Sequence, residues 1–345
     1  MNRSKIEWCD HTWNPVTGCR NGCSYCYARA MVKRFSGDTR LNKMDKDSYS
    51  LGKAADGGED LYILGEHMLD GAGKVIVYPF GFEPTFHKYR LDYPERLKMG
   101  NNIFVGAMSD IFGEWIPDTW LDEIMEACRK TPIHNYLFLT KHPQRYMQYN
   151  VPGGENMWYG TTITKEEETS RVMHLPEGHK RFASIEPLAG DIMPENHSWM
   201  FVCLDWIIIG AETGRRKDKT VPEWEWIRKI VDEAGKNGVP VFMKDSLVPV
   251  AGEENMCREF PVQLKNPGVS PKMYEKLYGI CCMCKAHMKK SSMVTLLARV
   301  KRGEQPKQYG FMCEECFTGF CNRSGLESST ILNMQKNNNG INKEV

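Results

Sequence analysis

Three cysteines near the start of the chain have the residue type and spacing of a metal-binding loop. Cys19, Cys23 and Cys26 follow the pattern C-x3-C-x2-C. Three thiolates on one short loop can hold three irons of a [4Fe-4S] cluster, which leaves the fourth iron free to bind a small molecule. The alternatives are zinc bound by these thiolates with a fourth ligand such as His11, or redox-sensitive thiols without metal.

A second group of cysteines lies near the end of the chain. Cys281 and Cys284 form one C-x2-C pair, and Cys313 and Cys316 form another after 28 intervening residues. Two such pairs can close a tetrahedral zinc site, which stabilises a unit too small to have a sufficient core. The spacing predicts a zinc ribbon or treble clef over residues 280–321, with an auxiliary iron-sulfur cluster as the alternative. Basic residues here would contact nucleic-acid phosphates or form a solvated charged face.

The composition excludes several classes of protein. The chain has 345 residues, of which 41% are hydrophobic and 26% charged, and this excludes a mostly disordered chain. Its formal charge of +1 provides no global attraction to nucleic acid or anionic lipid, so such contacts require a local patch. No apolar run reaches the roughly 20 residues of a membrane helix. Since the N-terminus also lacks an apolar signal core, we expect a cytoplasmic protein without a membrane partner.

Apolar runs that alternate with amphipathic stretches indicate the elements that must position these cysteines. Strands are predicted at residues 75–80, 103–108, 136–140, 157–162, 181–185, 206–210 and 239–243. Helices are predicted at residues 25–35, 117–130, 143–149, 165–173 and 222–237. This alternation indicates a parallel sheet, and a further strand between residues 6 and 16 brings the number to about eight. The sequence therefore predicts an α/β fold with a (β/α) barrel, partial or full.

The remaining segments suggest the domain boundaries. Residues 1–247 are expected to form the barrel, with 36–73 as an insertion or surface loop because Gly, Asp and Lys dominate there. Residues 248–279 contain several prolines without strong periodicity, which predicts a linker to the zinc-binding module. Residues 322–345 are rich in Ser, Asn and Lys and are expected to be disordered.

Polar residues recur directly after the predicted strands. In a parallel barrel these positions share one rim, which is the catalytic rim, whereas polar residues that merely mark strand ends are the plainer alternative. A buried ion pair across the barrel mouth would use the same residue types. The candidates at these positions are Glu83, Ser109, Asp110, Lys141, Glu186 and Glu212.

The first cysteine group resembles the signature of the radical S-adenosylmethionine (SAM) enzymes, which has this spacing and an aromatic residue, here Tyr25, before the last cysteine. Gly81-Phe82-Glu83-Pro84 resembles that superfamily's Gly-Gly-Glu-Pro motif, with Phe82 in place of the second glycine. The resemblance implies a [4Fe-4S] cluster on the three cysteines, with bound SAM as the source of a 5′-deoxyadenosyl radical that abstracts hydrogen. It also implies a one-electron reductant such as flavodoxin or ferredoxin.

The same resemblance suggests roles for the rim residues. Contacts with the cofactor are expected from Tyr25, Gly81, Glu83, Ser109 and Glu212. Catalytic contacts are expected from Asp110, Lys141 and Glu186.

A closer resemblance covers about residues 6–247. The stretches that carry it are Trp13-Asn-Pro-Val-Thr-Gly-Cys, Met108-Ser-Asp-Ile-Phe, Leu139-Thr-Lys, Ser184-Ile-Glu-Pro-Leu and Asp205-Trp-Ile-Ile-Ile-Gly-Ala-Glu-Thr-Gly. They are similar to a phage-associated family of radical-SAM-like proteins with no settled activity. The sequence therefore predicts a radical SAM enzyme, with a nucleic acid or nucleotide as the favoured substrate class. A photoproduct-type DNA repair lyase and a catalytically silent, zinc-dependent module that binds nucleic acid or protein are the alternatives.

Overall fold

The chain forms two compact units. The computed structural model describes residues 2–194, 198–213, 216–265, 278–283, 287–290, 293–298 and 307–323. The first unit comprises Met1–Val151 and Asn156–Gly268, and the second comprises Pro152–Glu155 and Val269–Val345. We call them the barrel unit and the C-terminal unit.

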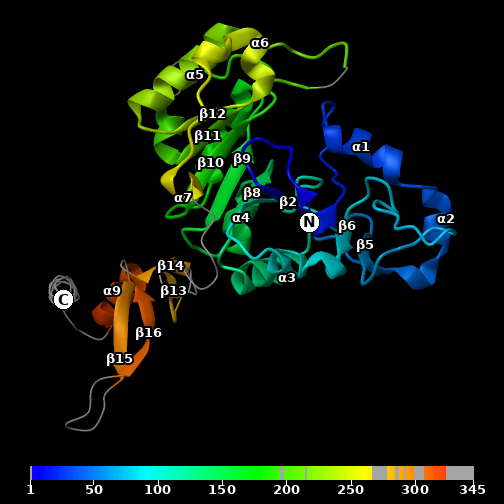
Figure 1. Cartoon of the computed structure of the whole chain (residues 1–345), viewed down its shortest axis with the longest axis horizontal. Coiled ribbons are helices and arrows are strands. Elements are labelled where there is room, and N and C mark those ends of the chain that lie inside the picture. Colours follow the sequence, from blue (N-terminus) through cyan, green and yellow to red (C-terminus); the bar gives the residue numbers. More distant parts are fainter. Residues whose placement is uncertain are drawn as a thin grey trace. The chain divides into compact units, whose positions relative to one another are not determined.

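An eight-stranded sheet forms the centre of the barrel unit (Figure 1). Its strands, in spatial order, are β1 (Asn2–Arg3), β2 (His11–Trp13), β7 (Asn102–Val105), β8 (Asn135–Thr140), β9 (Met157–Thr162), β10 (Lys180–Ile185), β11 (Trp206–Ile209) and β12 (Val241–Met243). β1 pairs antiparallel with β2, and the pairs from β2 to β12 are parallel. Because β1 and β12 lie at opposite edges, the sheet is an open half-barrel. The predicted α/β fold is confirmed, and the barrel is partial.

Both faces of this sheet are buried. On the inner face, alternate residues such as Phe104, Leu137 and Trp206 pack together with Trp8. On the outer face, residues such as Ile103 pack against the helices. Strands that are buried on both faces carry nearly continuous apolar runs, which explains why the sequence predicted β7 to β12 within a few residues.

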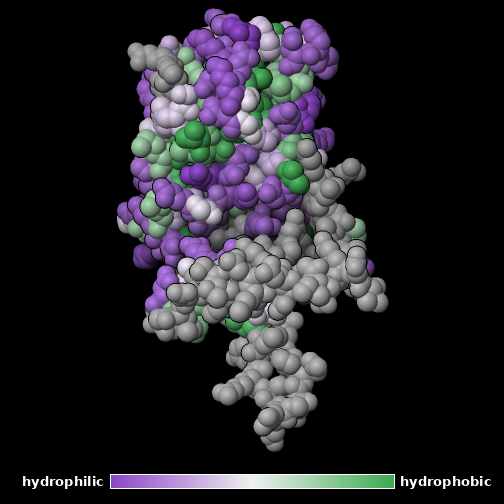
Figure 2. Space-filling view, turned by 90° about the vertical axis from the view of Figure 1, so that its left-hand side faces the viewer, coloured by the Kyte–Doolittle hydropathy of each residue, from purple (hydrophilic) through white to green (hydrophobic). Residues whose placement is uncertain are grey.

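Helices cover the outer face of the sheet. α3 (Asp118–Lys130), α4 (Gln144–Tyr149) and α5 (Trp224–Lys236) lie close to their predicted positions. The outer side of α5 carries an ion-paired row of Glu225, Arg228 and Asp232. Figure 2 views the molecule from the side that lies to the left in Figure 1, and the coloured surface there is largely hydrophilic. Within the described part of the chain, no helix combines the length and the apolar character that spanning a membrane requires.

The predicted helix at 165–173 is instead the 3-10 helix η4 (Glu166–His174). The Glu168 carboxylate turns back to accept hydrogen bonds from the N–H and hydroxyl of Thr164, at 2.7 and 2.8 Å. This contact ties the start of the segment into a tight turn, a setting in which 3-10 geometry is common.

A second, four-stranded sheet corrects two predictions. It consists of β3 (Val16–Thr17), β6 (Thr85–His87), β5 (Leu61–Leu64) and β4 (Ser50–Gly52). Residues 36–73, predicted as a loop, thus supply β4, β5 and the helix α2 (Thr39–Met44). The predicted strand at 75–80 was wrong, because Tyr78 and Phe80 pack into two separate apolar clusters and the backbone between them turns.

The segment that follows β12 corrects part of the predicted linker at 248–279. It contains α6 (Val248–Ala251), the 3-10 helix η7 (Glu253–Asn255) and α7 (Val262–Lys265). The N–H of Met243 donates to the carbonyl of Cys257 at 2.8 Å, and the N–H of Glu259 donates to the carbonyl of Val241 at 2.9 Å. This segment therefore covers what would be an open sheet edge. Residues 266–277 of the predicted linker lie outside the described residues.

The described residues of the C-terminal unit form two antiparallel pairs of strands and a helix. β13 (Tyr278–Ile280) pairs antiparallel with β14 (His287–Lys289), β15 (Met293–Ala298) pairs antiparallel with β16 (Lys307–Cys313), and α9 is Glu314–Arg323. α9 begins before the predicted disordered tail at 322–345, of which residues 324–345 lie outside the described residues. The described core is a small cluster in which cysteines are prominent.

Candidate active site and candidate metal centre

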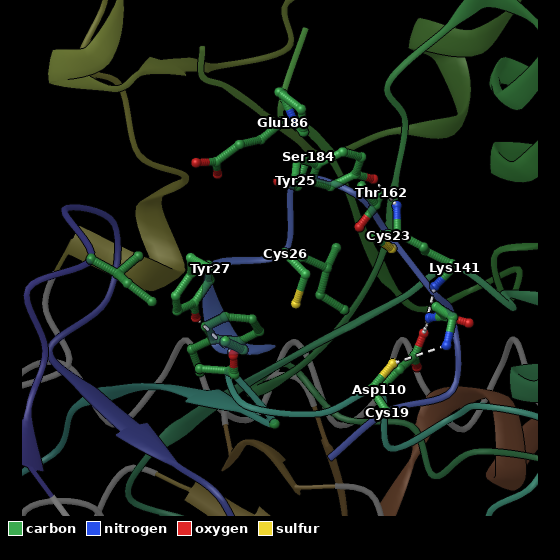
Figure 3. Close-up of a pocket in the computed structure, with 18 of the residues that line it drawn as sticks. Cys19, Cys23, Tyr25, Cys26, Tyr27, Asp110, Lys141, Thr162, Ser184 and Glu186 are labelled. Atoms are coloured by element: carbon green, nitrogen blue, oxygen red, sulfur yellow. Dashed lines mark hydrogen bonds between the residues drawn. The ribbon is translucent and has the colours of Figure 1, made fainter. Parts of the chain in front are cut away.

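A cavity of about 510 Å³ lies at the carboxyl ends of the parallel strands (Figure 3). This is the edge at which ligands bind in parallel α/β folds. Its apolar lining includes Trp8, Phe104 and Leu139 from the inner face of the sheet. Its polar lining includes Ser109, Asp110, Lys141, Thr162, Ser184, Glu186, Glu212 and Lys244. The structure thus brings six of the predicted site residues other than cysteines, Tyr25 among them, into one cavity.

Cys19, Cys23 and Cys26, which we call the N-terminal trio, line the same cavity (Figure 3). They lie on the loop between β3 and α1 (Tyr27–Phe35), and the Sγ of Cys26 caps this helix by accepting from the N–H of Arg29 at 3.4 Å. The loop curls tightly at Gly18, where φ is +84° and a Cβ atom would lie 2.3 Å from the carbonyl oxygen of Glu83. Only glycine fits there without displacing the backbone.

The spacing of the sulfur atoms separates two kinds of metal site. A tetrahedral zinc ion with Zn–S bonds near 2.3 Å holds its sulfur ligands about 3.8 Å apart. Among the described residues, the N-terminal trio does not form a group whose sulfur atoms all lie within 4.8 Å of one another. The described lining of the cavity contains no histidine and no further cysteine. Three separated thiolates beside an open cavity therefore fit a cluster better than a single ion.

His11, the alternative fourth ligand, does not face this loop. Along β2 it lies two residues from Trp13 and therefore on the same face, and Trp13 belongs to the core on the outer face of the sheet. His11 lies near the buried His134, and its electrostatic effect adds to burial, the main cause, in lowering the pKa of His134 to about 4. The zinc alternative that required His11 therefore lacks its ligand.

Lys141 and Tyr25 form a polar contact inside the cavity. The Lys141 Nζ donates to the Tyr25 hydroxyl at 2.6 Å. Burial lowers the pKa of Lys141 and raises the pKa of Tyr25, because both charged forms lose solvation. Lys141 thus presents an ammonium that donates to a neutral hydroxyl, next to the cysteine loop.

The other candidate side chains in the cavity differ in whether they are paired. Glu186 forms an ion pair with Lys244, and Glu212 forms one with Arg216 at 2.7 Å. The Oγ of Ser109 is buried and has no hydrogen-bond partner among the described residues. A buried hydroxyl without a partner costs free energy unless a ligand or water satisfies it.

The Gly81-Phe82-Glu83-Pro84 segment is placed differently from the expectation. Phe82 lines the cavity, whereas Gly81 and Glu83 are not among its lining residues. The backbone of the segment supports the cysteine loop, since the N–H of Cys19 donates to the carbonyl of Phe82 at 3.2 Å.

Sequence reasoning missed several polar residues at this site, among them Asn21, His142 and Tyr27. Asn21 lies within the cysteine motif, and His142 directly follows Lys141, so their positions alone could have drawn attention to them. The hydroxyl of Tyr27, which lines the cavity, donates to the carbonyl of Ala107 at 2.7 Å. No pattern in the sequence indicates this contact.

A second cysteine centre lies in the C-terminal unit. Cys281, Cys313 and Cys316, which we call the C-terminal trio, have sulfur atoms that all lie within 4.8 Å of one another. The N–H of Cys316 donates to the Sγ of Cys313 at 3.4 Å, as expected when a C-x2-C turn wraps around its first sulfur. Three of the four predicted zinc ligands are thus brought together, and Cys284 lies outside the described residues.

Comparisons with known proteins give a family and a distant likeness. No curated protein matches the sequence. Two solved structures of spore photoproduct lyase mutants, one of them with dinucleoside spore photoproduct, align with TM-scores of 0.40 and 0.39. Each is 12% identical over 70% of this chain and 79% of the lyase chain. The family described as "Protein of unknown function (DUF5131)" matches residues 3–248, and the chain belongs to this family.

Proposed function

We propose that the barrel unit is a radical SAM enzyme. The observation that carries this proposal is the N-terminal trio, whose C-x3-C-x2-C sulfur atoms line a cavity at the carboxyl ends of a parallel half-barrel. A [4Fe-4S] cluster on these cysteines would supply the electron that cleaves SAM to a 5′-deoxyadenosyl radical. The electron itself would come from a one-electron reductant such as flavodoxin or ferredoxin.

The residues around the trio have roles that suit this chemistry. Trp8, Phe104 and Leu139 give the cavity an apolar lining that excludes water from a reactive intermediate. The unpartnered hydroxyl of Ser109 is available to bind a ligand. The ammonium of Lys141 is available for an anionic group.

We further propose a nucleotide or nucleic acid as the substrate class. Aromatic side chains and ammonium groups lie together in the cavity, and such combinations bind the bases and phosphates of nucleotides. The aromatic residues are Trp8, Tyr25, Tyr27 and Phe104, and the lysines are Lys5, Lys141 and Lys244. Hydrogen abstraction from this substrate is the expected first chemical step.

The experiment that tests the proposed function is detection of 5′-deoxyadenosine. The full chain is reconstituted with iron and sulfide without oxygen, reduced, and incubated with SAM in the presence and absence of oligonucleotides. We expect 5′-deoxyadenosine from the wild-type chain and none from Cys23→Ala. A reconstituted wild-type chain that binds no iron and contains only zinc would reject the proposal and favour a catalytically silent binding module.

We propose a second, structural role for the C-terminal trio, namely zinc binding. The observation that favours it is the close approach of the three sulfur atoms, which suits a single tetrahedral ion. Purified chain is expected to hold one zinc per molecule, and Cys284 is the expected fourth ligand. Iron and sulfide in place of zinc at this site would instead indicate an auxiliary cluster.

A further inference from the structure

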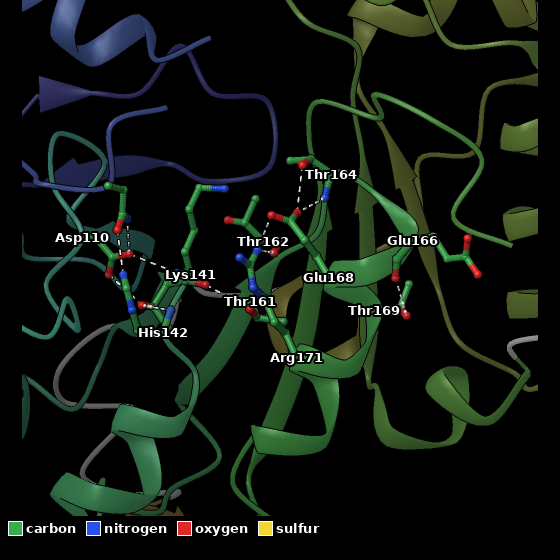
Figure 4. A network of polar contacts seen from close by, with 12 residues as sticks. Asp110, Lys141, His142, Thr161, Thr162, Thr164, Glu166, Glu168, Thr169 and Arg171 are labelled. Carbon is green, nitrogen blue, oxygen red and sulfur yellow. Dashed lines mark hydrogen bonds and ion pairs between the residues drawn. The ribbon is translucent and has the colours of Figure 1, made fainter. Parts of the chain in front are cut away.

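Asp110 lies at the centre of a polar network at the rim of the sheet (Figure 4). Its Oδ1 accepts from the hydroxyl of Thr140 at 2.7 Å and from the N–H of Phe112 at 3.3 Å. Its Oδ2 accepts from the N–H of Lys141 at 3.0 Å and from the Asn21 side chain at 2.9 Å. Asp110 is only 5% exposed, so both oxygens are engaged within the protein. A carboxylate in this state is poorly placed to accept a proton from a substrate.

Asn21 connects this network to the cysteine loop. It is the middle residue between Cys19 and Cys23, and its N–H donates to the Sγ of Cys19 at 3.4 Å. While its amide Nδ2 donates to Asp110, its Oδ1 accepts from the Nε2 of His142 at 2.6 Å. Both ends of the Asn21 amide are therefore held by residues at the end of the sheet.

The charge of Asp110 is not neutralised by a direct partner within this network. Its four hydrogen-bond donors are neutral N–H and O–H groups. The ammonium of the adjacent Lys141 extends away from Asp110 (Figure 4). It donates to the hydroxyl of Tyr25 instead. The negative charge lies close to the cysteine loop, because Asn21 donates to both Asp110 and the Sγ of Cys19, and Asp110 and Cys19 line the same cavity.

We propose that Asp110, Asn21 and His142 form a clamp that positions the loop of Cys19 and Cys23 for cluster binding, and that the buried charge of Asp110 lowers the cluster's reduction potential. The inference rests on the proposed function. Asp110 then acts as a positioning residue and does not have the catalytic role that was expected from the sequence. A fixed negative charge beside a cluster makes the gain of an electron less favourable, and groups that orient metal ligands affect how tightly the metal is held.

The test compares reconstituted clusters in the full chain. Asp110→Asn keeps the shape of the side chain but removes its charge and replaces one acceptor oxygen with a donor. We expect iron to be lost to a chelator at about 10- to 100-fold lower chelator concentration than in the wild type, as for other groups that orient ligands. We also expect a higher midpoint potential and an altered electron paramagnetic resonance (EPR) spectrum of the reduced cluster.

A second pair of variants separates positioning from charge and guards against misfolding. His142→Ala removes the donor to Asn21 and is expected to weaken iron retention without raising the potential as Asp110→Asn does. His142→Gln retains an amide donor and is expected to restore retention. Asp205→Asn is the matched control, since Asp205 also accepts a main-chain N–H, that of Arg181 at 2.9 Å, but does not line the cavity.

The outcomes distinguish the clamp from the proposed function. A wild-type chain that binds no cubane contradicts both. A wild-type cluster whose iron retention and potential are unchanged in Asp110→Asn contradicts the clamp alone. Equal iron retention in His142→Ala and His142→Gln would also overturn the positioning role of His142.

Discussion

The N-terminal trio and the C-terminal trio differ in the spacing of their sulfur atoms and in what surrounds them. The C-terminal trio is compact and lies in a small cluster with Met293, Val294 and Phe317. The N-terminal trio is more widely spaced, and it lines a cavity with charged groups and an unpartnered hydroxyl. A compact, enclosed trio suits an ion that stabilises a fold. A separated trio beside a cavity suits a cofactor that must reach a substrate.

The two sites also lie in units whose hydrophobic cores differ in size. The barrel unit has a large core on both faces of its main sheet, so we expect it to fold without metal. The described core of the C-terminal unit is much smaller, and a small domain commonly needs a metal to compensate. Removing metal should therefore have opposite consequences for the two units, with loss of function in one and loss of structure in the other.

The largest expected effect is the complete loss of cluster iron in Cys23→Ala, since two thiolates remain where three are required. Zinc bound in the C-terminal unit should be unchanged. Iron, sulfide and zinc are measured per chain after anaerobic reconstitution. Cys203→Ala, a cysteine outside both trios, is the control and should retain both metals. If Cys23→Ala retained its cluster iron, the assignment of different metals to the two trios would be contradicted.

Cys313→Ser is expected to have the converse effect. It should lose zinc and with it the fold of the C-terminal unit, because structural zinc contributes about 10 to 16 kcal/mol to small zinc-binding peptides. Limited proteolysis should then cut the chain after residue 278 while the barrel unit persists and still binds iron. A protease-resistant C-terminal unit without zinc would show that this trio is not structural.

The reactivity of Cys19 tests the environment of the N-terminal trio before metal is bound. Burial, with a contribution from Asp110, raises the pKa of Cys19 from 9.0 to about 12. In the metal-free chain at pH 8, its thiolate fraction should be about a thousandfold below that of an ordinary thiol, and should rise tenfold per pH unit until the pH nears 12. Alkylation with iodoacetamide, followed by mass spectrometry, measures this. Alkylation of Cys19 as fast as in the unfolded chain would contradict the burial.

The smallest expected effect concerns the curvature of the same loop. Gly18 and Gly22 both have positive φ, but only at Gly18 would a Cβ atom meet neighbouring backbone. Gly22→Ala should therefore cost about 1 to 2 kcal/mol of loop stability. Gly18→Ala should cost more and weaken iron retention as well. Chelator titration and thermal melting compare the two, and equal effects would show that the approach to Glu83 is unimportant.

Much of the fold could be predicted from the sequence because burial on both faces of the sheet leaves apolar runs. β7 to β12, α3 and α5 follow from these runs and from helical periodicity. The strand at 75–80 could not be distinguished from an irregular segment, since Phe80 is buried by stacking on Tyr62, with ring centroids 3.9 Å apart, and not by strand pairing. Short strands such as β4 and β5 carry too few residues for a clear period.

The candidate site was predictable to the extent that it depends on local spacing. The two C-x2-C pairs and the C-x3-C-x2-C loop are visible in the sequence, and the rim residues follow from the ends of strands. The bonds from Asn21 to Asp110 and His142 join residues about 90 and 120 positions apart. Such pairs depend on the register between the loop and the sheet, which a single sequence does not encode in any local pattern.

The most direct test of the central claim is EPR spectroscopy of the reduced, anaerobically reconstituted chain with and without SAM. If one corner of the N-terminal cluster is open, the spectrum should show one [4Fe-4S] cluster per chain, and SAM should change its g values. The absence of such a cluster, or a spectrum that SAM leaves unaltered, would contradict the assignment of the cavity as a radical SAM site.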